Sequence, residues 1–338
     1  MDQQVLVTGA TGFIAGHVIE ELLEHGYAVR ATVRDLANTR GREHLLALAD
    51  RLDAPLDFVT ADLTDESGWA AAVSGCDAVL HVASPFPATE PENAQALVDT
   101  AVQGTLRVLR ACAAAGSVRR VVLTSSTAAI TYGHRDRRPR TEEDWSIPEA
   151  SPAYPRSKTL AERAAWAFVE KLPDDSRFEL AVVNPGMVLG PLQTANPSTS
   201  HEPILRLLSR SVPGSPRVGW ATVDVRDLAR AHRLALETPS AAGNRYICAG
   251  EHVWMSDLAR LLATEYPRIP TRELPSWLVR TLARFDKGIR LTVAMLDRVE
   301  HLSPARARRD LGWTARPLEN TVHDTAASLL AHGLVPTR

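Results

Sequence analysis

The sequence predicts an α/β fold, in which a doubly wound parallel sheet is followed by a smaller and mostly helical C-terminal lobe. Over the first 190 residues, short apolar runs alternate with helical patterns, which is the order of consecutive βαβ units. Beyond that point helical patterns predominate. We therefore predict a first domain over residues 1–190, with a returning segment near residues 221–240, and a second over residues 191–338.

The composition is that of a globular protein and narrows the possible partners. A formal net charge of −2 does not favour a nucleic-acid partner. No stretch approaches the roughly 18 apolar residues of a membrane helix, and the N-terminus enters a strand pattern without the profile of a signal peptide. Three widely spaced cysteines suit neither a disulfide framework nor a zinc site. We expect a cytoplasmic monomer or homodimer that acts on a small molecule without a metal.

A glycine-rich turn lies between the first strand and the first helix. Residues 5–7 and 28–33 have strand patterns, and a helical pattern runs between them over residues 17–25. Gly9 permits a tight turn, and Gly12 lets a pyrophosphate approach the backbone at the helix N-terminus. In this βαβ setting the turn predicts a dinucleotide site. The competing interpretation is a glycine turn without a ligand.

The end of the second strand distinguishes NAD from NADP. An NAD site usually places a carboxylate there, which bonds the ribose 2′-hydroxyl. Here Val33 is followed by Arg34, and Arg40 is nearby. A guanidinium suits a 2′-phosphate by charge and geometry. We interpret Asp35 as a cap of the next turn or helix, which is expected over residues 36–52. The sequence therefore favours NADP(H).

Polar or small residues follow the later strands as well. These strands are expected over residues 57–60, 78–83, 119–124 and 178–183. Because the carboxyl ends of parallel strands meet at one edge of a sheet, the residues just beyond them should line a ligand crevice. Asp62 and Leu63 could hold an adenine, and the hydroxyls of residues 125–127 could touch a substrate or simply form a polar strand exit. His81 lies within its strand and is predicted to be a packed histidine.

A tyrosine and a lysine, Tyr154 and Lys158, are four residues apart after a long charged loop over residues 133–151. Four residues are about one helical turn, so both side chains would share a helix face. Because proline is tolerated only in the first turn of a helix, Pro155 indicates a helix that begins near residue 151 or 152. A phenol beside an ammonium group is a proton donor with a tunable pKa.

These motifs together resemble a known family. The segments 8–16, 124–126 and 184–186 and the Tyr154/Lys158 pair occur in the order of an extended short-chain dehydrogenase/reductase. Four further segments are similar to dihydroflavonol 4-reductase, cinnamoyl-CoA reductase and the microbial NADPH aldehyde/ketone reductases: residues 33–35, 80–85, 157–162 and 223–227. The resemblance covers nearly the whole chain, with Ala15 as a departure at the third glycine of the turn. It implies a Rossmann domain, a C-terminal substrate lobe and a Ser-Tyr-Lys site.

By position, the resemblance makes Ser126 the catalytic serine, Tyr154 the proton donor and Lys158 its partner, with Ser125 as the alternative serine. We expect the Lys158 cation to lower the pKa of Tyr154. The predicted cofactor-binding residues are Gly9, Thr11, Gly12, Phe13, Ile14, Arg34, Arg40, Asp62, Leu63, Val82, Ala83, Ser84, Tyr154, Lys158, Pro185 and Val188. The predicted substrate pocket consists of Ser84, Phe86, Ser126, Met187, Leu192, Gln193 and Trp220.

The predicted function is NADPH-dependent reduction of an aldehyde or ketone to the alcohol. Two other functions share the fold. A nucleotide-sugar epimerase or dehydratase would keep NAD bound, which Val33 and Arg34 disfavour. A non-catalytic NADP-sensing protein would usually lack part of the catalytic set, whereas Ser126, Tyr154 and Lys158 are all present.

Overall fold

The computed structural model describes residues 3–335 apart from 40, 86–92, 285–292 and 294. Two predicted site residues, Arg40 and Phe86, lie outside the described residues. Contacts divide the chain into two units. The first unit comprises residues 1–185, 226–248 and 303–314, and the second comprises residues 186–225, 249–302 and 315–338. The chain thus passes between the units several times, and segment 303–314 joins the first unit although the sequence placed it in the C-terminal lobe.

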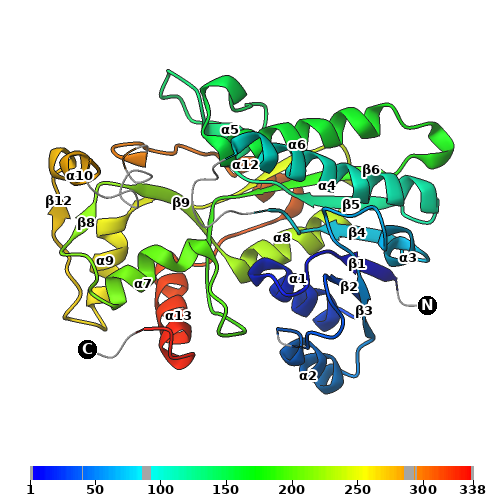
Figure 1. The fold of residues 1–338 in the computed structure, drawn as a ribbon, viewed down its shortest axis with the longest axis horizontal. Helices are drawn as coiled ribbons and strands as arrows, with labels where there is room; N and C mark the ends of the chain where they lie inside the picture. Colours follow the sequence, from blue (N-terminus) through cyan, green and yellow to red (C-terminus); the bar gives the residue numbers. More distant parts are fainter. Residues whose placement is uncertain (1–2, 40, 86–92, 285–292, 294, 336–338) are drawn as a thin grey trace. The chain divides into compact units, whose positions relative to one another are not determined.

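Among the described residues of the first unit, seven strands form one parallel sheet (Figure 1). In chain order they are β1 (Gln4–Val7), β2 (Ala28–Val33), β3 (Leu56–Thr60), β4 (Ala78–His81), β5 (Arg120–Thr124), β6 (Glu179–Pro185) and β10 (Arg245–Cys248). Their order across the sheet is β10-β6-β5-β4-β1-β2-β3, and all neighbours are parallel. The predicted doubly wound α/β fold is confirmed.

The strand order reverses between β1 and β4. From β1 the chain proceeds outward to β2 and β3, then returns to place β4 on the other side of β1. In open α/β sheets, ligands bind beside the strand carboxyl ends at such a reversal. The turn after β1 and the loop after β4 therefore border the expected ligand position.

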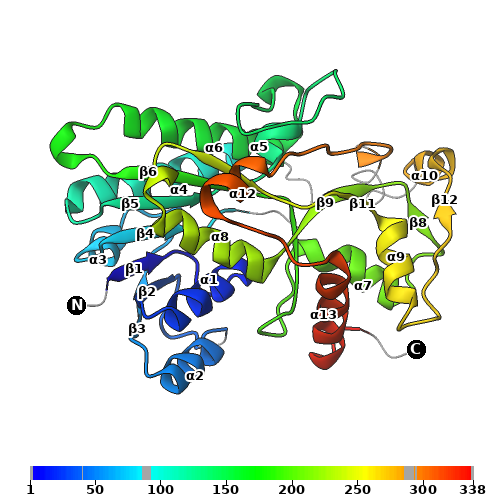
Figure 2. The same ribbon diagram turned by 180° about the vertical axis from the view of Figure 1, so that it is seen from behind.

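Helices cover both faces of this sheet (Figures 1 and 2). The helices α4 and α6 lie side by side over one face, and α1 and α8 lie over the other. Apolar side chains of α3, α4 and α6 pack on Leu6, Val79, Val121 and Leu180 to form a buried core. The helices of this unit are α1 (Phe13–Glu24), α2 (Glu43–Leu52), α3 (Trp69–Val73), α4 (Ala94–Ala115), α5 (Ala128–Thr131), α6 (Ala153–Glu170), α8 (Val225–Glu237) and α12 (Ala305–Leu311), with short 3₁₀ turns at Pro148–Ala150, Asp174–Ser176 and Pro239–Ala241.

The segment between β2 and α2 differs from the prediction. The helix begins at Glu43 rather than at residue 36. Asp35 accepts a hydrogen bond from the backbone N–H of Ala37 at 2.8 Å, which makes it the cap of a turn, as predicted. Gly41 then has a φ of +87°, a left-handed conformation that interrupts a helix. A Cβ on Gly41 would lie 3.6 Å from Thr11, so this loop runs beside the glycine turn.

The second unit combines small sheets with helices. The strands β7 (Met187–Leu189), β9 (Gly219–Asp224) and β11 (His252–Trp254) form a three-stranded sheet, and β8 (Ser215–Pro216) pairs with β12 (Glu273–Leu274). The described helices are α7 (Glu202–Leu208), α9 (Met255–Ala263), α10 (Ser276–Leu282) and α13 (Leu318–Ala331), with a 3₁₀ turn at Thr199–His201. The sequence did not indicate β7 or β11, because three-residue strands carry too little periodicity.

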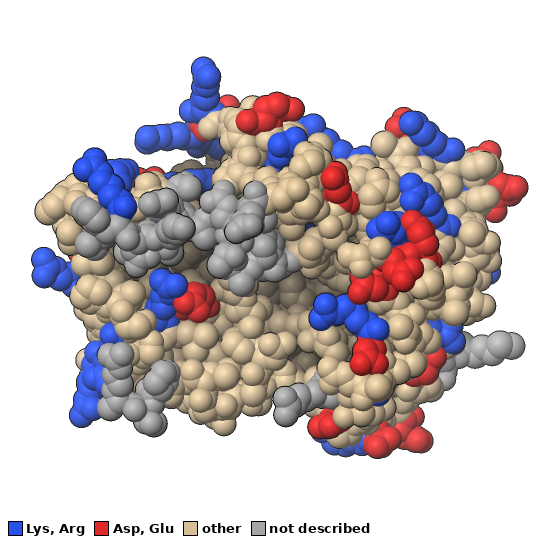
Figure 3. All heavy atoms as spheres, viewed as in Figure 1, with Lys and Arg blue, Asp and Glu red and all other residues tan. Residues whose placement is uncertain are grey.

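Acidic and basic side chains are interspersed over the face of the molecule in Figure 3. Ion pairs on the surface of the protein include Arg206–Glu202 and Arg217–Glu273. Of the helices formed by the described residues, none is long and apolar enough to cross a membrane.

Candidate active site

The glycine turn after β1 has the geometry of an anion-binding helix start. Gly9 has a φ of +77°, and a Cβ there would lie 3.0 Å from the Cβ of Ala83. Gly12 is the exposed N-cap of α1 and provides no side-chain cap, and the first helical turn has no acidic residue. The N–H groups of a first helical turn have no partners within the helix and favour an anion. Thr11, Gly12, Phe13 and Ile14 therefore lie where a pyrophosphate could be held.

Two threonines that the sequence analysis missed hold this turn. The Thr8 hydroxyl oxygen accepts hydrogen bonds from the N–H groups of Val82 and Ala83, each at 3.0 Å, and lies 2.8 Å from Nδ1 of His81. The Thr32 hydroxyl oxygen accepts one from the N–H of Gly9 at 2.9 Å. The exits of β1, β2 and β4 are thereby joined. A threonine directly before a glycine turn is the sequence signal that could have identified Thr8.

His81 is a packed histidine, as predicted. It is buried within β4, and its Nδ1 pairs with Thr8. Burial, followed by the charge of Lys158, lowers its pKa to about 3. His81 is therefore neutral at physiological pH and adds no positive charge beside Lys158.

Arg34 lies at the end of β2 with its side chain exposed. The charge of Arg34 acts on Asp62, just beyond β3. Hydrogen bonds from the backbone and side chain of Thr64 hold the pKa of Asp62 below its usual value, and the charge of Arg34 lowers it further. Leu63 packs against α4, since a Cβ on Gly104 would lie 3.0 Å from its Cβ.

Arg42 adds a second guanidinium to this edge, which the sequence analysis did not single out. It lies 5.3 Å from the centre of the Phe58 ring. Arg34 and Arg42 supply guanidinium groups that could contact a phosphate on the ribose, with the carboxylates of Asp35 and Asp62 beside them.

The predicted catalytic tyrosine and lysine lie one turn apart at the start of α6. Pro152 is the N-cap, so Tyr154 and Pro155 are in the first turn, as predicted. The Ser126 side chain lies close enough to the Tyr154 hydroxyl to lower its pKa. Lys158 is buried and donates to the backbone oxygen of Thr124, with 3.4 Å between the two atoms. The three predicted catalytic residues therefore converge beside the end of β5.

The expectation that Lys158 lowers the pKa of Tyr154 is wrong for this structure. Burial raises the pKa of the Tyr154 phenol well above its usual value, and the Ser126 side chain only partly opposes this. Burial also lowers the pKa of Lys158 to about 8, while the charge of Glu162 acts in the other direction. Desolvation disfavours the charged form of both groups and exceeds their pairwise effects.

The two adjacent serines have different surroundings. Ser125 is buried, and its hydroxyl donates to Oε2 of Glu162 at 2.5 Å. Ser126 is only partly buried, its oxygen accepts from the N–H of Ala128 at 3.1 Å, and its side chain reaches Tyr154. Of the two, Ser126 is placed to contact a ligand.

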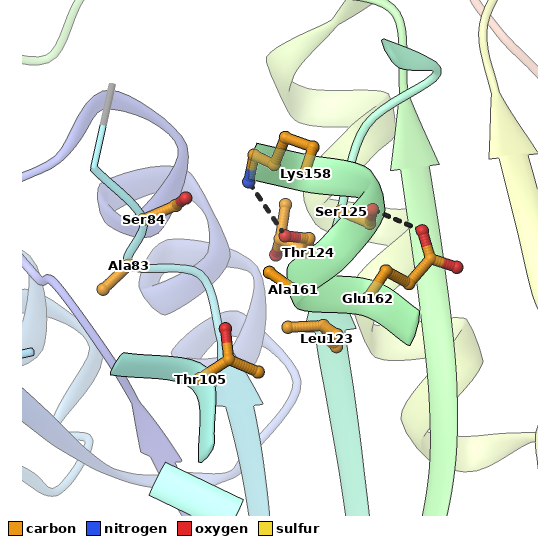
Figure 4. A pocket seen from close by; sticks show the side chains of 9 residues that line it. All are labelled: Ala83, Ser84, Thr105, Leu123, Thr124, Ser125, Lys158, Ala161 and Glu162. Atoms are coloured by element: carbon orange, nitrogen blue, oxygen red, sulfur yellow. Dashed lines mark hydrogen bonds between the residues drawn. The ribbon is translucent and has the colours of Figure 1, made fainter. Parts of the chain in front are cut away.

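A small pocket opens beside Lys158 (Figure 4). It is lined by side chains of α4, α6 and the exits of β4 and β5: Ala83, Ser84, Thr105, Leu123, Thr124, Ser125, Lys158, Ala161 and Glu162. It brings the predicted residues Ala83 and Ser84 to the same place as Lys158. The described part of the chain contains no cluster of three or more side chains arranged to bind a metal.

The remaining predicted residues belong to two different units. Pro185 ends β6 in the first unit, where its backbone oxygen accepts from Thr127. The others lie in the second unit: Met187, Val188, Leu192, Gln193 and Trp220. Leu192 is buried, and its backbone N–H donates to Ser328 of α13 at 3.0 Å. The part that these residues play in the site stays a prediction.

Comparison with known proteins identifies the family. The model of the NAD dependent epimerase/dehydratase family matches residues 5–249. The chain belongs to this family. Its plant relatives are reductases, as the sequence had indicated for an extended short-chain dehydrogenase/reductase, so that prediction is confirmed.

A cinnamoyl-CoA reductase of Medicago truncatula is 38% identical over 277 residues, which cover 80% of this chain and 82% of the relative. Tetraketide alpha-pyrone reductase 1 of Arabidopsis thaliana is 33% identical and covers 100% of this chain, which spans 99% of that protein. Among solved structures, the yeast methylglyoxal/isovaleraldehyde reductase Gre2 complexed with NADPH superposes with a TM-score of 0.79 at 27% identity and covers 98% of this chain and 100% of that one.

Proposed function

We propose that the protein is an NADP-dependent oxidoreductase that reduces an aldehyde or ketone to the alcohol by hydride transfer, with Ser126, Tyr154 and Lys158 as its catalytic residues. The observation that carries the proposal is that Ser126, Tyr154 and Lys158 meet beside the end of β5: Lys158 donates to the backbone oxygen of Thr124, and the Ser126 side chain is close enough to act on the pKa of Tyr154, one helical turn from Lys158. These groups lie at the carboxyl edge of the sheet that also carries the glycine turn.

Two observations support NADP(H) as the cofactor. The relative Gre2 was solved with NADPH, and Arg34 stands at the end of β2, where an NAD site would have a carboxylate. The glycine turn would hold the pyrophosphate, Arg34 and Arg42 the 2′-phosphate, Asp62 and Leu63 the adenine, and Tyr154 and Lys158 the ribose next to the nicotinamide. When bound, NADPH supplies the hydride.

The residues of the chain supply the rest of the chemistry. The Ser126 and Tyr154 side chains lie close together, so a carbonyl oxygen placed beside them would accept from both hydroxyls. The Tyr154 phenol keeps its proton at neutral pH, as tyrosine ordinarily does, and can donate it to the oxygen as the alcohol forms. Lys158 below it favours the phenolate left behind, which its ammonium can stabilise up to about pH 8.

The substrate class follows from what the relatives share. Their names specify a cinnamoyl-CoA, a tetraketide pyrone, and methylglyoxal or isovaleraldehyde. These compounds differ in size but are all reduced. The second-unit residues proposed for the pocket are mostly apolar: Met187, Leu192, Gln193 and Trp220. We infer an aliphatic or aromatic carbonyl substrate.

A panel assay tests this function. The purified protein is incubated with NADPH and aldehydes, α-diketones, β-ketoesters or aryl ketones, and the loss of NADPH absorbance is followed together with the alcohol product. The panel is repeated with NADH. Oxidation with at least one class, faster with NADPH, is expected. No turnover in any class, or NAD released from the denatured protein in stoichiometric amount, would instead favour an epimerase or dehydratase.

A further inference from the structure

A buried carboxylate lies one helical turn beyond Lys158. Glu162 is 1% exposed. Its Oε1 accepts from Nε of Arg245 at 2.5 Å, and its Oε2 accepts from the Ser125 hydroxyl at 2.5 Å and from Nδ2 of Asn184 at 2.9 Å. Both oxygens are thus held by donors from β6, from β10 and from the residue just beyond β5.

Arg245 completes this arrangement from β10. It is 6% exposed, its guanidinium lies 3.7 Å from the centre of the Trp145 ring, and it donates to the backbone oxygens of Glu142 and Asp144. A buried ion pair whose groups are all satisfied gives little net stability over apolar side chains of the same size. The stability of the fold alone therefore does not account for the buried pair of Glu162 and Arg245.

Glu162 and Lys158 line the same pocket from α6, with the carboxylate directed to Ser125 and the ammonium to the backbone oxygen of Thr124 (Figure 4). Residues four apart lie on one helix face. From β4, the titratable neighbour of Lys158 is His81, which is neutral because burial lowers its pKa to about 3. From β5, Lys158 meets the backbone oxygen of Thr124. The residue of α4 that lines the pocket is Thr105, which is uncharged. Glu162 is the acidic side chain that acts on Lys158, and its charge opposes the effect of burial.

The same carboxylate also fixes the place of the catalytic serine. Asn184, held by Glu162, donates through the same Nδ2 to the backbone oxygen of Ser126 at 3.2 Å. Ser125, also held by Glu162, immediately precedes Ser126. The ends of β5 and β6 are therefore joined to α6 through one side chain.

We propose that Glu162 is a positioning residue of the active site, which keeps Lys158 in its ammonium form and holds the Ser126 backbone against the helix that carries Tyr154. The inference rests on the proposed function, since it assigns Lys158 to the reaction. In this proposal Glu162 contacts neither the substrate nor the cofactor. It acts through Lys158, Ser125 and Asn184.

The small number of lysines makes the charge of Lys158 measurable without an activity assay. The sequence contains three lysines, Lys158, Lys171 and Lys287. Protein grown with lysine labelled by ¹³C at Cε gives three signals, which are assigned with Lys171→Arg and Lys287→Arg. Their chemical shifts are followed from pH 6 to pH 11 in the full-length protein.

Three variants distinguish the effect of the Glu162 charge from the effect of its side-chain size. Glu162→Gln keeps the size but removes the charge, Glu162→Asp keeps the charge, and Glu142→Gln is the matched control. Glu142 is a buried carboxylate of the same region that accepts from the N–H of Ile247 at 3.1 Å. We expect Glu162→Gln to lower the titration midpoint of Lys158 by about one pH unit or more. Glu162→Asp and Glu142→Gln should leave the midpoint within about 0.3 units of the wild-type value, well below that effect.

The pH profile of turnover provides the second measurement. In the wild type, turnover should fall as the pH rises through the midpoint of Lys158, and in Glu162→Gln this fall should move to lower pH by the same amount. If Glu162→Gln does not fold because Arg245 is left unpaired, the double variant Glu162→Gln/Arg245→Met is compared with Arg245→Met. Because Arg245 is absent from both, the difference between their Lys158 midpoints isolates the charge of Glu162, and the double variant should have the lower midpoint.

The outcomes are distinct. An unchanged Lys158 midpoint in Glu162→Gln overturns the role of Glu162, whatever the activity. A uniform loss of turnover with an unshifted pH profile indicates a purely structural residue and also overturns it. A shifted midpoint in a protein that reduces none of the carbonyls leaves the role toward Lys158 in place and overturns the proposed function instead.

Discussion

Two parts of the same sheet edge are built in opposite ways. At the exits of β1, β2 and β4, the site consists of backbone N–H groups, two threonine hydroxyls and the exposed residues Thr11 and Gly12. At the exits of β5 and β6, it consists of side chains fixed by the buried pair of Glu162 and Arg245. The first part suits a ligand that enters and leaves. The second suits groups that must keep their position and charge while a proton moves.

The difference predicts where substitutions change turnover and where they change binding. Tyr154→Phe removes the proposed proton donor and leaves the glycine turn untouched, so we expect turnover to fall about 10³-fold. NADPH binding, followed by quenching of protein fluorescence, should weaken by at most about tenfold, which corresponds to the loss of one hydrogen bond to the ribose. Turnover near the wild-type rate would remove Tyr154 from the reaction.

The neighbouring serines provide the next test. Ser126→Ala removes the hydroxyl that reaches Tyr154, and by analogy with the loss of one oxyanion donor we expect kcat to fall about 10²-fold. Ser125→Ala removes one neutral donor to Glu162, whose remaining partners Asn184 and Arg245 stay in place, so kcat should fall only a few fold, on the order of one hydrogen bond. The reverse order of effects would make Ser125 the catalytic serine.

The two parts also differ in how far the sequence predicts them. The glycine turn, Arg34 and the start of α6 at Pro155 are specified by residues within one short segment each, and local geometry follows from local chemistry. Glu162 and Arg245 are 83 positions apart in the sequence. Trp145, whose ring lies against the Arg245 guanidinium, is in a loop without periodicity. Such a network depends on the strand order, which no local pattern encodes.

The sequence analysis expected a lowered pKa for Tyr154, whereas the pKa is raised, and the reason is related. Spacing along a helix indicates that a tyrosine and a lysine are neighbours, but not how deeply both are buried. In the structure, desolvation outweighs the pair and moves both pKa values toward the neutral forms. Burial is a property of the assembled sheet and helices, so only the folded chain supplies it.

Arg34→Ala tests the cofactor side. Loss of a charge-assisted contact to a 2′-phosphate costs about 1.5–3 kcal/mol, which corresponds to a rise in the KM for NADPH of about 10- to 100-fold. The KM for NADH should not change, because that cofactor lacks the phosphate. The control is Arg119→Ala, an exposed arginine directly before β5 at the opposite edge of the sheet. Equal effects on both cofactors would contradict a 2′-phosphate contact.

The glycine turn offers the smallest and most specific effect, because the chain contains a matched glycine. Gly9 and Gly26 have φ values of +77° and +79°, so alanine at either position should lower the free energy of unfolding by about 1–2 kcal/mol. A Cβ on Gly9 would meet Ala83 at 3.0 Å, whereas one on Gly26 would meet nothing within 4 Å.

Gly9→Ala should therefore also displace the turn and weaken NADPH binding about tenfold, or 1.4 kcal/mol, and Gly26→Ala should not. Thermal unfolding and NADPH titration of both variants measure the two effects separately. If both variants lose the same stability and neither loses affinity, the turn is a structural element of the fold, and the pyrophosphate must be held elsewhere on the sheet edge.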